Sequence, residues 1–213
     1  MIKKIMIHLS GFMFIALGIV GVIFSRVGAT PLDAFNYFVY TLTPLTLGTI
    51  AVISGLVVST IAYLLDPKKD MLISIGFLFL VGLFIDGWKF LFEIIFPLGI
   101  DSFFIRIPLA GFSLISITFG AALTLTTGLA SSPFERLLII INRKVNNLML
   151  SKIMMEGTFL ILAVIMGLIT GLLFEQVHVY TLILVLGIGP FISMFVDLIN
   201  KQKRKGVEVH GIK

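Results

Sequence analysis

Six long apolar stretches run along the chain, separated by short polar segments. Each has close to the ~20 residues that a helix needs to cross about 30 Å of hydrocarbon. A membrane barrel would show short segments of alternating hydrophobicity instead, and the sequence has none. The pattern therefore predicts an all-α polytopic membrane protein with a single membrane domain. The six predicted transmembrane helices cover residues 5–25, 45–65, 71–90, 107–130, 153–173 and 179–199.

The first half of the chain aligns with the second half at an offset of 102 residues, without a gap over about forty positions. Thr30–Asp33 aligns with Ser132–Glu135, and Gly18 aligns with Gly120. Three spans in each half is an odd number, so the second half must enter the membrane in the opposite direction. We therefore expect a 3+3 inverted-topology repeat, a construction found among secondary transporters. The predicted units are residues 1–105, residues 106–200 and a basic cytoplasmic tail at 201–213.

Composition and charge agree with insertion into a membrane. Of the 213 residues, 58% are hydrophobic and 13% are charged, about half the charged fraction of a soluble domain. With the N-terminus in the cytoplasm, 13 of the 16 basic residues fall on the inner side, and only Arg26, Lys89 and Arg106 fall outside. The positive-inside rule therefore predicts that both termini are cytoplasmic. We interpret the basic tail as an anchor to lipid headgroups rather than a nucleic-acid site.

A short segment follows the first span and the fourth span, at residues 31–43 and 133–150. Each begins with a helix-capping pattern: Thr30 and Ser132 are expected N-caps, and Asp33 and Glu135 lie at N3. We expect the first short helix to begin at the outer membrane surface and the second at the inner surface. One interpretation is a pair of interfacial or re-entrant helices. The other is that their N-termini line a pathway, which favours a cation, a proton or a neutral solute because acidic caps already occupy these termini.

Glu156 is the most informative ionisable residue, because it lies about one turn inside the fifth span. A carboxylate there costs roughly 2.5–3.5 kcal/mol unless it is protonated or paired. Pairing with Lys152 or exposure to the inner surface are the structural alternatives to a functional role. Asp86, near the outer end of the third span, is expected to pair with Lys89 or Arg26 or to face a cavity. The candidate substrate-binding residues are Pro31, Asp33, Asn36, Ser54, Asp86, Glu156 and Pro190.

The sequence shows few features of an enzyme or of a metal site. It has no cysteine, and its three histidines lie far apart. It has no H-E-x-x-H, G-x-S-x-G or G-K-[ST] motif. Val52–Gly55 lacks the glycine that a rhomboid-like protease carries before its nucleophile. We expect neither catalysis nor a cofactor.

The stretch Gly28–Ala34 resembles the signature that follows the first span in the YczE/YyaS/YitT group of bacterial membrane proteins. Gly82–Asp86 is similar to the third-span motif of that group, and the resemblance is closest to the YczE branch. Ala130–Glu135 departs from the group's G-x-G-P-[RW]-D pattern, so a ligand role for Glu135 is not carried over. The resemblance implies a protein of the bacterial inner membrane and leaves its activity open.

Three functions are compatible with these features. The first is a small secondary transporter or permease for an unidentified solute or ion, with its site between the repeats. The second is a substrate-binding subunit that works with a partner membrane subunit. The third is a regulatory or scaffold protein whose loop 131–152 is the docking surface. Glycine-rich faces of the spans can pack within the chain or in a homo-oligomer, so the oligomeric state stays open.

Overall fold

The computed structural model describes residues 2–67, 71–129 and 132–210. Every regular element in these residues is a helix. The elements are α1 (Ile2–Ser25), α2 (Pro31–Leu42), α3 (Leu47–Leu65), α4 (Met71–Ile95), α5 (Phe103–Thr127), α6 (Pro133–Val145), α7 (Leu148–Thr170), α8 (Leu173–Gln176) and α9 (Val179–His210).

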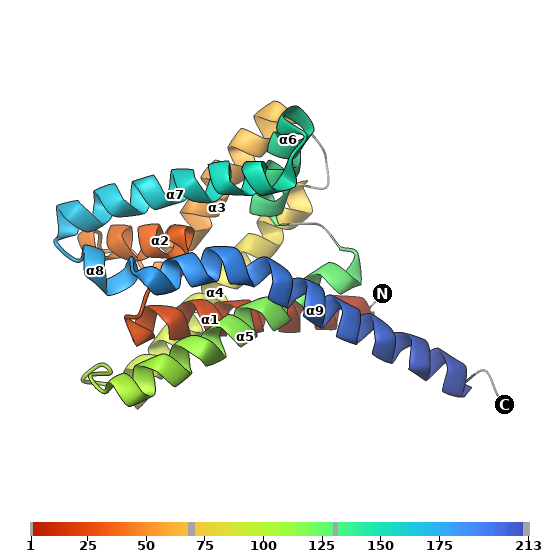
Figure 1. The fold of residues 1–213 in the computed structure, drawn as a ribbon, viewed down its shortest axis with the longest axis horizontal. Helices are drawn as coiled ribbons and strands as arrows, with labels where there is room; N and C mark the ends of the chain where they lie inside the picture. The colour runs from red at the N-terminus through yellow and green to blue at the C-terminus, as the bar shows by residue number, and fades with distance from the viewer. Residues whose placement is uncertain (1, 68–70, 130–131, 211–213) are drawn as a thin grey trace.

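Within the described residues, six helices are long and apolar enough to cross a membrane: α1, α3, α4, α5, α7 and α9. This agrees with the six spans predicted from the sequence. Helix α1 begins and α9 ends at the same end of the molecule (Figure 1). Helix α1 packs between α5 and α4, and α9 packs on α5. The short helix α2 packs against α7, and the short helix α6 packs against α3.

Helices α1 and α5 are antiparallel and pack closely because small residues face each other across their contact. A methyl group added to Gly11 would overlap the Gly120 carbonyl, and one added to Gly18 would overlap the Ser113 carbonyl. Between these points, the Ser116 hydroxyl donates a 2.7 Å hydrogen bond to the Phe14 carbonyl. Small residues allow such close backbone approach between membrane helices, where packing and hydrogen bonds drive association.

The segment after α5 is shorter than expected, because asparagines end one helix and start the next. Asn146 adopts a left-handed conformation (φ 53°) that ends α6. The side chain of Asn147 then accepts a 3.0 Å hydrogen bond from the Leu150 N–H. Helix α7 therefore begins at Leu148 instead of residue 153, and the short segment does not reach residue 150. The four-residue helix α8 after Gly171 was not predicted either.

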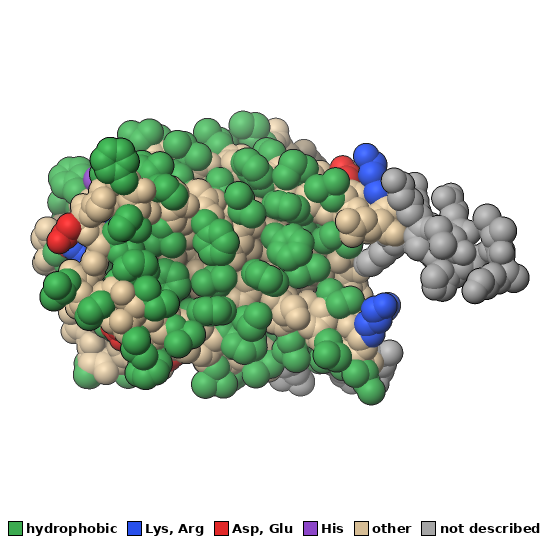
Figure 2. Space-filling model, turned by 90° about the horizontal axis from the view of Figure 1, so that it is seen from below, with side chains coloured by type: hydrophobic (Ala, Val, Ile, Leu, Met, Phe, Trp, Pro, Cys, Tyr) green, Lys and Arg blue, Asp and Glu red, His purple; other side chains and the backbone are tan. Residues whose placement is uncertain are grey.

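The surface carries many exposed hydrophobic side chains, as expected for helices that face lipid. Leu83, at the middle of α4, is 67% exposed, and Leu186, two turns into α9, is 68% exposed. Figure 2 shows hydrophobic side chains covering the middle of one face, while the charged side chains visible there lie mainly toward its two ends. This distribution matches a hydrocarbon layer with polar boundaries.

Candidate functional site

The start of α2 holds a buried carboxylate. Thr30 is the N-cap, and its hydroxyl oxygen accepts a 3.2 Å bond from the Asp33 N–H. The same hydroxyl donates a 2.6 Å bond to Asp33 Oδ2. Asp33 is buried, and no cation of the described residues lies within ion-pair distance of it. Burial raises the pKa of Asp33 to about 6, although the hydrogen bond from Thr30 acts in the opposite direction. Asp33 belongs to α2, which is not one of the spanning helices.

The start of α6 repeats this arrangement with one difference. Ser132 accepts a 3.2 Å bond from the Glu135 N–H, and Glu135 Oε2 accepts a 3.3 Å bond from the Ser132 N–H, which completes a capping box. Asp33 is one methylene shorter, and it binds the cap hydroxyl instead of the cap N–H that we expected. Burial raises the pKa of Glu135, although its backbone hydrogen bond acts in the other direction.

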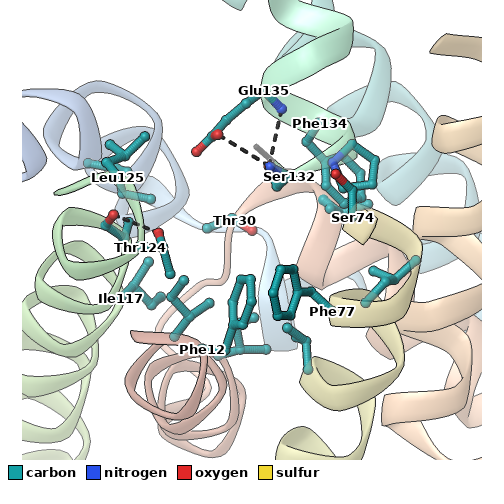
Figure 3. Close-up of a pocket in the computed structure, with 18 of the residues that line it drawn as sticks. Phe12, Thr30, Ser74, Phe77, Ile117, Thr124, Leu125, Ser132, Phe134 and Glu135 are labelled. Carbon is teal, nitrogen blue, oxygen red and sulfur yellow. Dashed lines mark hydrogen bonds between the residues drawn. The ribbon is translucent and has the colours of Figure 1, made fainter. Parts of the chain in front are cut away.

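A cavity of about 510 Å³ lies where these two helix starts approach each other. Seven helices contribute to its wall, and along α1 it extends from His8 to Ile19, across the middle of this helix. Figure 3 shows Phe12 and Phe77 on one side, Ser132 and Glu135 on the other, and Thr30 between them. Most of the lining is hydrophobic.

The two short helices thus begin at one cavity, where we expected them to begin at opposite membrane surfaces. The cause is the non-helical segment before α2. Arg26 and Gly28 have positive φ angles, and the Ala29 N–H donates a 2.8 Å bond to the carbonyl of Gln176, the last residue of α8. The chain therefore turns back from the end of α1 before α2 starts.

Glu156 of α7 lines the same cavity and is partly buried. The expected pairing with Lys152 does not form: the Lys152 ammonium donates a 3.0 Å bond to the Val185 carbonyl of α9. Among the described residues, no hydrogen bond or ion pair engages the Glu156 carboxylate. Lys152 therefore stands between α7 and α9, which do not pack closely against each other.

Helices α3 and α4, in contrast, pack closely against each other. A methyl group on Gly48 would overlap both the Gly82 carbonyl and the Asp86 carboxylate. Asp86 Oδ1 accepts a 2.7 Å bond from the Gly48 N–H, and Oδ2 accepts a 2.6 Å bond from the Thr46 hydroxyl. Asp86 thus fixes α4 to the start of α3. This differs from the expected pairing with Lys89 or Arg26, because Lys89 pairs with Glu93 and Arg26 with Glu175.

The structure brings only part of the predicted site together. Of the candidate binding residues, Asp33 and Glu156 line the cavity, as do the predicted caps Thr30, Ser132 and Glu135. Asn36 and Ser54 bond to each other at 2.6 Å outside the lining, and Pro31, Asp86 and Pro190 are not part of it either. Asp33 and Glu156 are close enough for the charge of Glu156 to act on Asp33.

Sequence reasoning missed the other half of the lining. His8 is fully buried, and its Nδ1 forms a 2.9 Å hydrogen bond with the Thr127 hydroxyl. Its ring lies 4.6 Å from the rings of both Phe12 and Phe77. A lone histidine inside an apolar span was the available signal, but its partners Phe77 and Thr127 come from α4 and α5. Among the described residues, no three His, Asp or Glu side chains gather closely enough to hold a metal ion.

Comparison with known proteins gives the family. The model of a family of unknown function, DUF6198, matches residues 2–197. The chain belongs to this family. The uncharacterized protein YyaS of Bacillus subtilis (strain 168) is 29% identical over 163 residues, which cover 76% of this chain and 80% of YyaS. No solved structure matches the chain. The resemblance to the YczE/YyaS/YitT group is thereby confirmed.

Proposed function

We propose that this protein is a small secondary transporter of the bacterial inner membrane, with both termini cytoplasmic. Its site is the cavity between two inversely oriented three-span repeats, residues 1–105 and 106–200. The observation that carries the proposal is the cavity itself, to which both repeats contribute the start of a short helix and an acidic residue. Binding sites at a repeat interface, built from interrupted helices, are typical of such transporters.

The packing of the helices supports the inverted repeat. Exchanging α1 with α5, α2 with α6, α3 with α7 and α4 with α9 converts one set of contacts into another. The α2–α7 contact becomes α6–α3, and the α1–α4 contact becomes α5–α9. The same exchange relates Gly11–Gly120 to Ser113–Gly18 at the 102-residue offset. A two-fold axis across the α1–α5 contact would relate the contacts of the two halves in this way.

The two repeats differ most in one contact, and this difference supports alternating access. Helices α3 and α4 close on each other at Gly48 and Gly82, near the end of α1 that is distant from the N-terminus. Their counterparts α7 and α9 do not pack closely, and the Lys152 ammonium bridges them through its bond to the Val185 carbonyl. A close contact in one repeat and a loose one in the other is the asymmetry expected of one of the two states that a transporter must visit.

A labelling experiment tests the proposal without knowledge of the solute. The chain has no cysteine, so Ile19→Cys introduces a single thiol in the cavity lining. We expect a membrane-impermeant maleimide to reach it from both sides of oriented vesicles, because the cavity opens to each side in turn. Leu98→Cys, at a site 92% exposed at the distant end, is the control and should react from one side only. Reaction of Ile19→Cys from a single side would contradict transport and favour a capture subunit or a scaffold.

A further inference from the structure

The cavity combines a hydrophobic wall with an excess of negative charge. Asp33, Glu135 and Glu156 line it, and none of its described lining residues is a lysine or arginine. The starts of α2 and α6 each contribute about half a positive charge. The Lys152 ammonium lies outside the lining, although its charge acts on Glu156. Three carboxylates outweigh this one ammonium and two helix termini, so the ionised cavity is negative. An anion is disfavoured there.

Aromatic rings form a second recognisable part of the wall. Phe12 and Phe77 form one pair, with ring centroids 5.4 Å apart. Phe134 and Phe159 form another, at 6.0 Å, on α6 and α7. Figure 3 shows Phe12 and Phe77 facing the cavity opposite the start of α6. Ring faces attract cations, and most strongly those that have lost their water.

The size and chemistry of the site exclude a tightly held metal ion as the best occupant. A volume of about 510 Å³ falls in the range of sites that enclose small organic molecules, roughly 300–1,000 Å³. Among the described residues, the acidic groups do not converge into a metal cluster. A large, weakly hydrated cation can instead contact separated carboxylates and rings at the same time.

We propose that the cavity binds an apolar organic cation, with its charge facing Asp33, Glu135 and Glu156 and its hydrocarbon surface against the four phenylalanine rings. This inference rests on the proposed function, because it names the substrate class of the same cavity.

Binding of tetraphenylphosphonium to the purified full-length protein tests the inference. Tetraphenylborate is the matched control, since it has nearly the same shape and the opposite charge. We expect saturable binding and a rise in melting temperature with the phosphonium and neither effect with the borate. Equal affinity for the two ions would overturn the inference, because shape alone would then account for binding.

Variants locate the effect in the cavity. Glu156→Gln and Glu135→Gln should each weaken phosphonium binding by about tenfold. Glutamine also completes a capping box, so Glu135→Gln retains the start of α6. Glu93→Gln removes an exposed carboxylate that does not line the cavity and should bind as the parent does. Unchanged affinity in both cavity variants would contradict the inference.

The two proposals fail in different ways. If Ile19→Cys reacts from both sides but the phosphonium does not bind, the substrate class is wrong and transport stands. If the phosphonium binds in the expected charge-dependent way but Ile19→Cys reacts from one side only, the cation site stands and transport is wrong.

Discussion

Ser116 of α5 donates a hydrogen bond to the carbonyl of Phe14 in α1, and the two residues are 102 positions apart. This is the offset at which the two halves of the sequence align. In the proposed repeat, each residue thus contacts its own counterpart, as residues beside a two-fold axis do. The flanking contacts, Gly11 with Gly120 and Gly18 with Ser113, stand on either side of this point. The proposed repeat therefore has its centre at one hydrogen bond.

The first prediction concerns this helix contact. Gly120→Ala should destabilise the protein by about 1–3 kcal/mol, because the added methyl group overlaps the Gly11 carbonyl and the backbone of Ile15. Gly111→Ala, in the same helix, meets no atom and should be neutral or stabilising by about 0.5–1 kcal/mol. Thermal unfolding in detergent measures both. Equal effects of the two substitutions would mean that the contact is not tight.

The second prediction concerns pH. The folded pKa of Asp33 is raised to about 6, so the folded state holds this proton more tightly than the unfolded state does. The contribution of Asp33 to stability is therefore lost as pH rises from about 4 to about 6. Asp33→Asn should remove the share of the pH dependence that comes from Asp33, leave the share of Glu135, and stabilise the protein at pH 7 by about 2–3 kcal/mol.

Melting temperatures between pH 4 and pH 8 check the result. Asp101→Asn is the control, because Asp101 lies at the surface, with its side chain 94% exposed, and should keep the dependence of the parent. A steeper loss of stability with rising pH in Asp33→Asn than in the parent would show that the Asp33 carboxylate is not the source of the pH dependence.

The third prediction concerns the contact between α3 and α4. Asp86→Ala removes the acceptor of both the Thr46 hydroxyl and the Gly48 N–H, and should cost about 1–3 kcal/mol. If the closed contact is a gate, the same change should also speed labelling of Ile19→Cys from the distant side. Glu93→Ala, on the same helix, removes an exposed ion pair and should change stability by less than about 1 kcal/mol. Loss of stability without faster labelling would show that Asp86 caps the start of α3 and that the α3–α4 contact is not a gate.

The fourth prediction compares the two caps. Ser132→Ala and Thr30→Ala each remove an N-cap hydroxyl worth about 1 kcal/mol. Thr30→Ala should cost more, since it also leaves the buried Asp33 without its hydroxyl donor. The double variant Thr30→Ala/Asp33→Asn should recover part of that difference in a thermal unfolding series. No recovery would indicate that the cap, rather than the carboxylate, accounts for the loss.

The spans and both helix caps were predictable because they depend on local properties of the chain. About twenty apolar residues need a membrane wherever they lie, and Thr30–Asp33 is a complete capping signal within four residues. Asp86 was different: its partners Thr46 and Gly48 lie some forty positions earlier, so its neighbours in sequence suggested ion pairs that do not form. The aromatic and histidine lining likewise depends on contacts between four helices. The start of α7 was missed because a single Asn147 cap carries little signal.

The α1–α5 contact also has a consequence for how this architecture can evolve. In the proposed repeat, Gly11 and Ser113 occupy equivalent places on its two sides, yet only one of them is glycine. Ser113 places its hydroxyl against Gly21 and bonds it to the Leu109 carbonyl of its own helix at 2.7 Å. In a dimer of identical short chains, any change would have altered both sides together. In the proposed repeat, fusion into one chain frees each side to mutate alone, so selection can set the resting bias of the proposed transporter toward one particular side of the membrane.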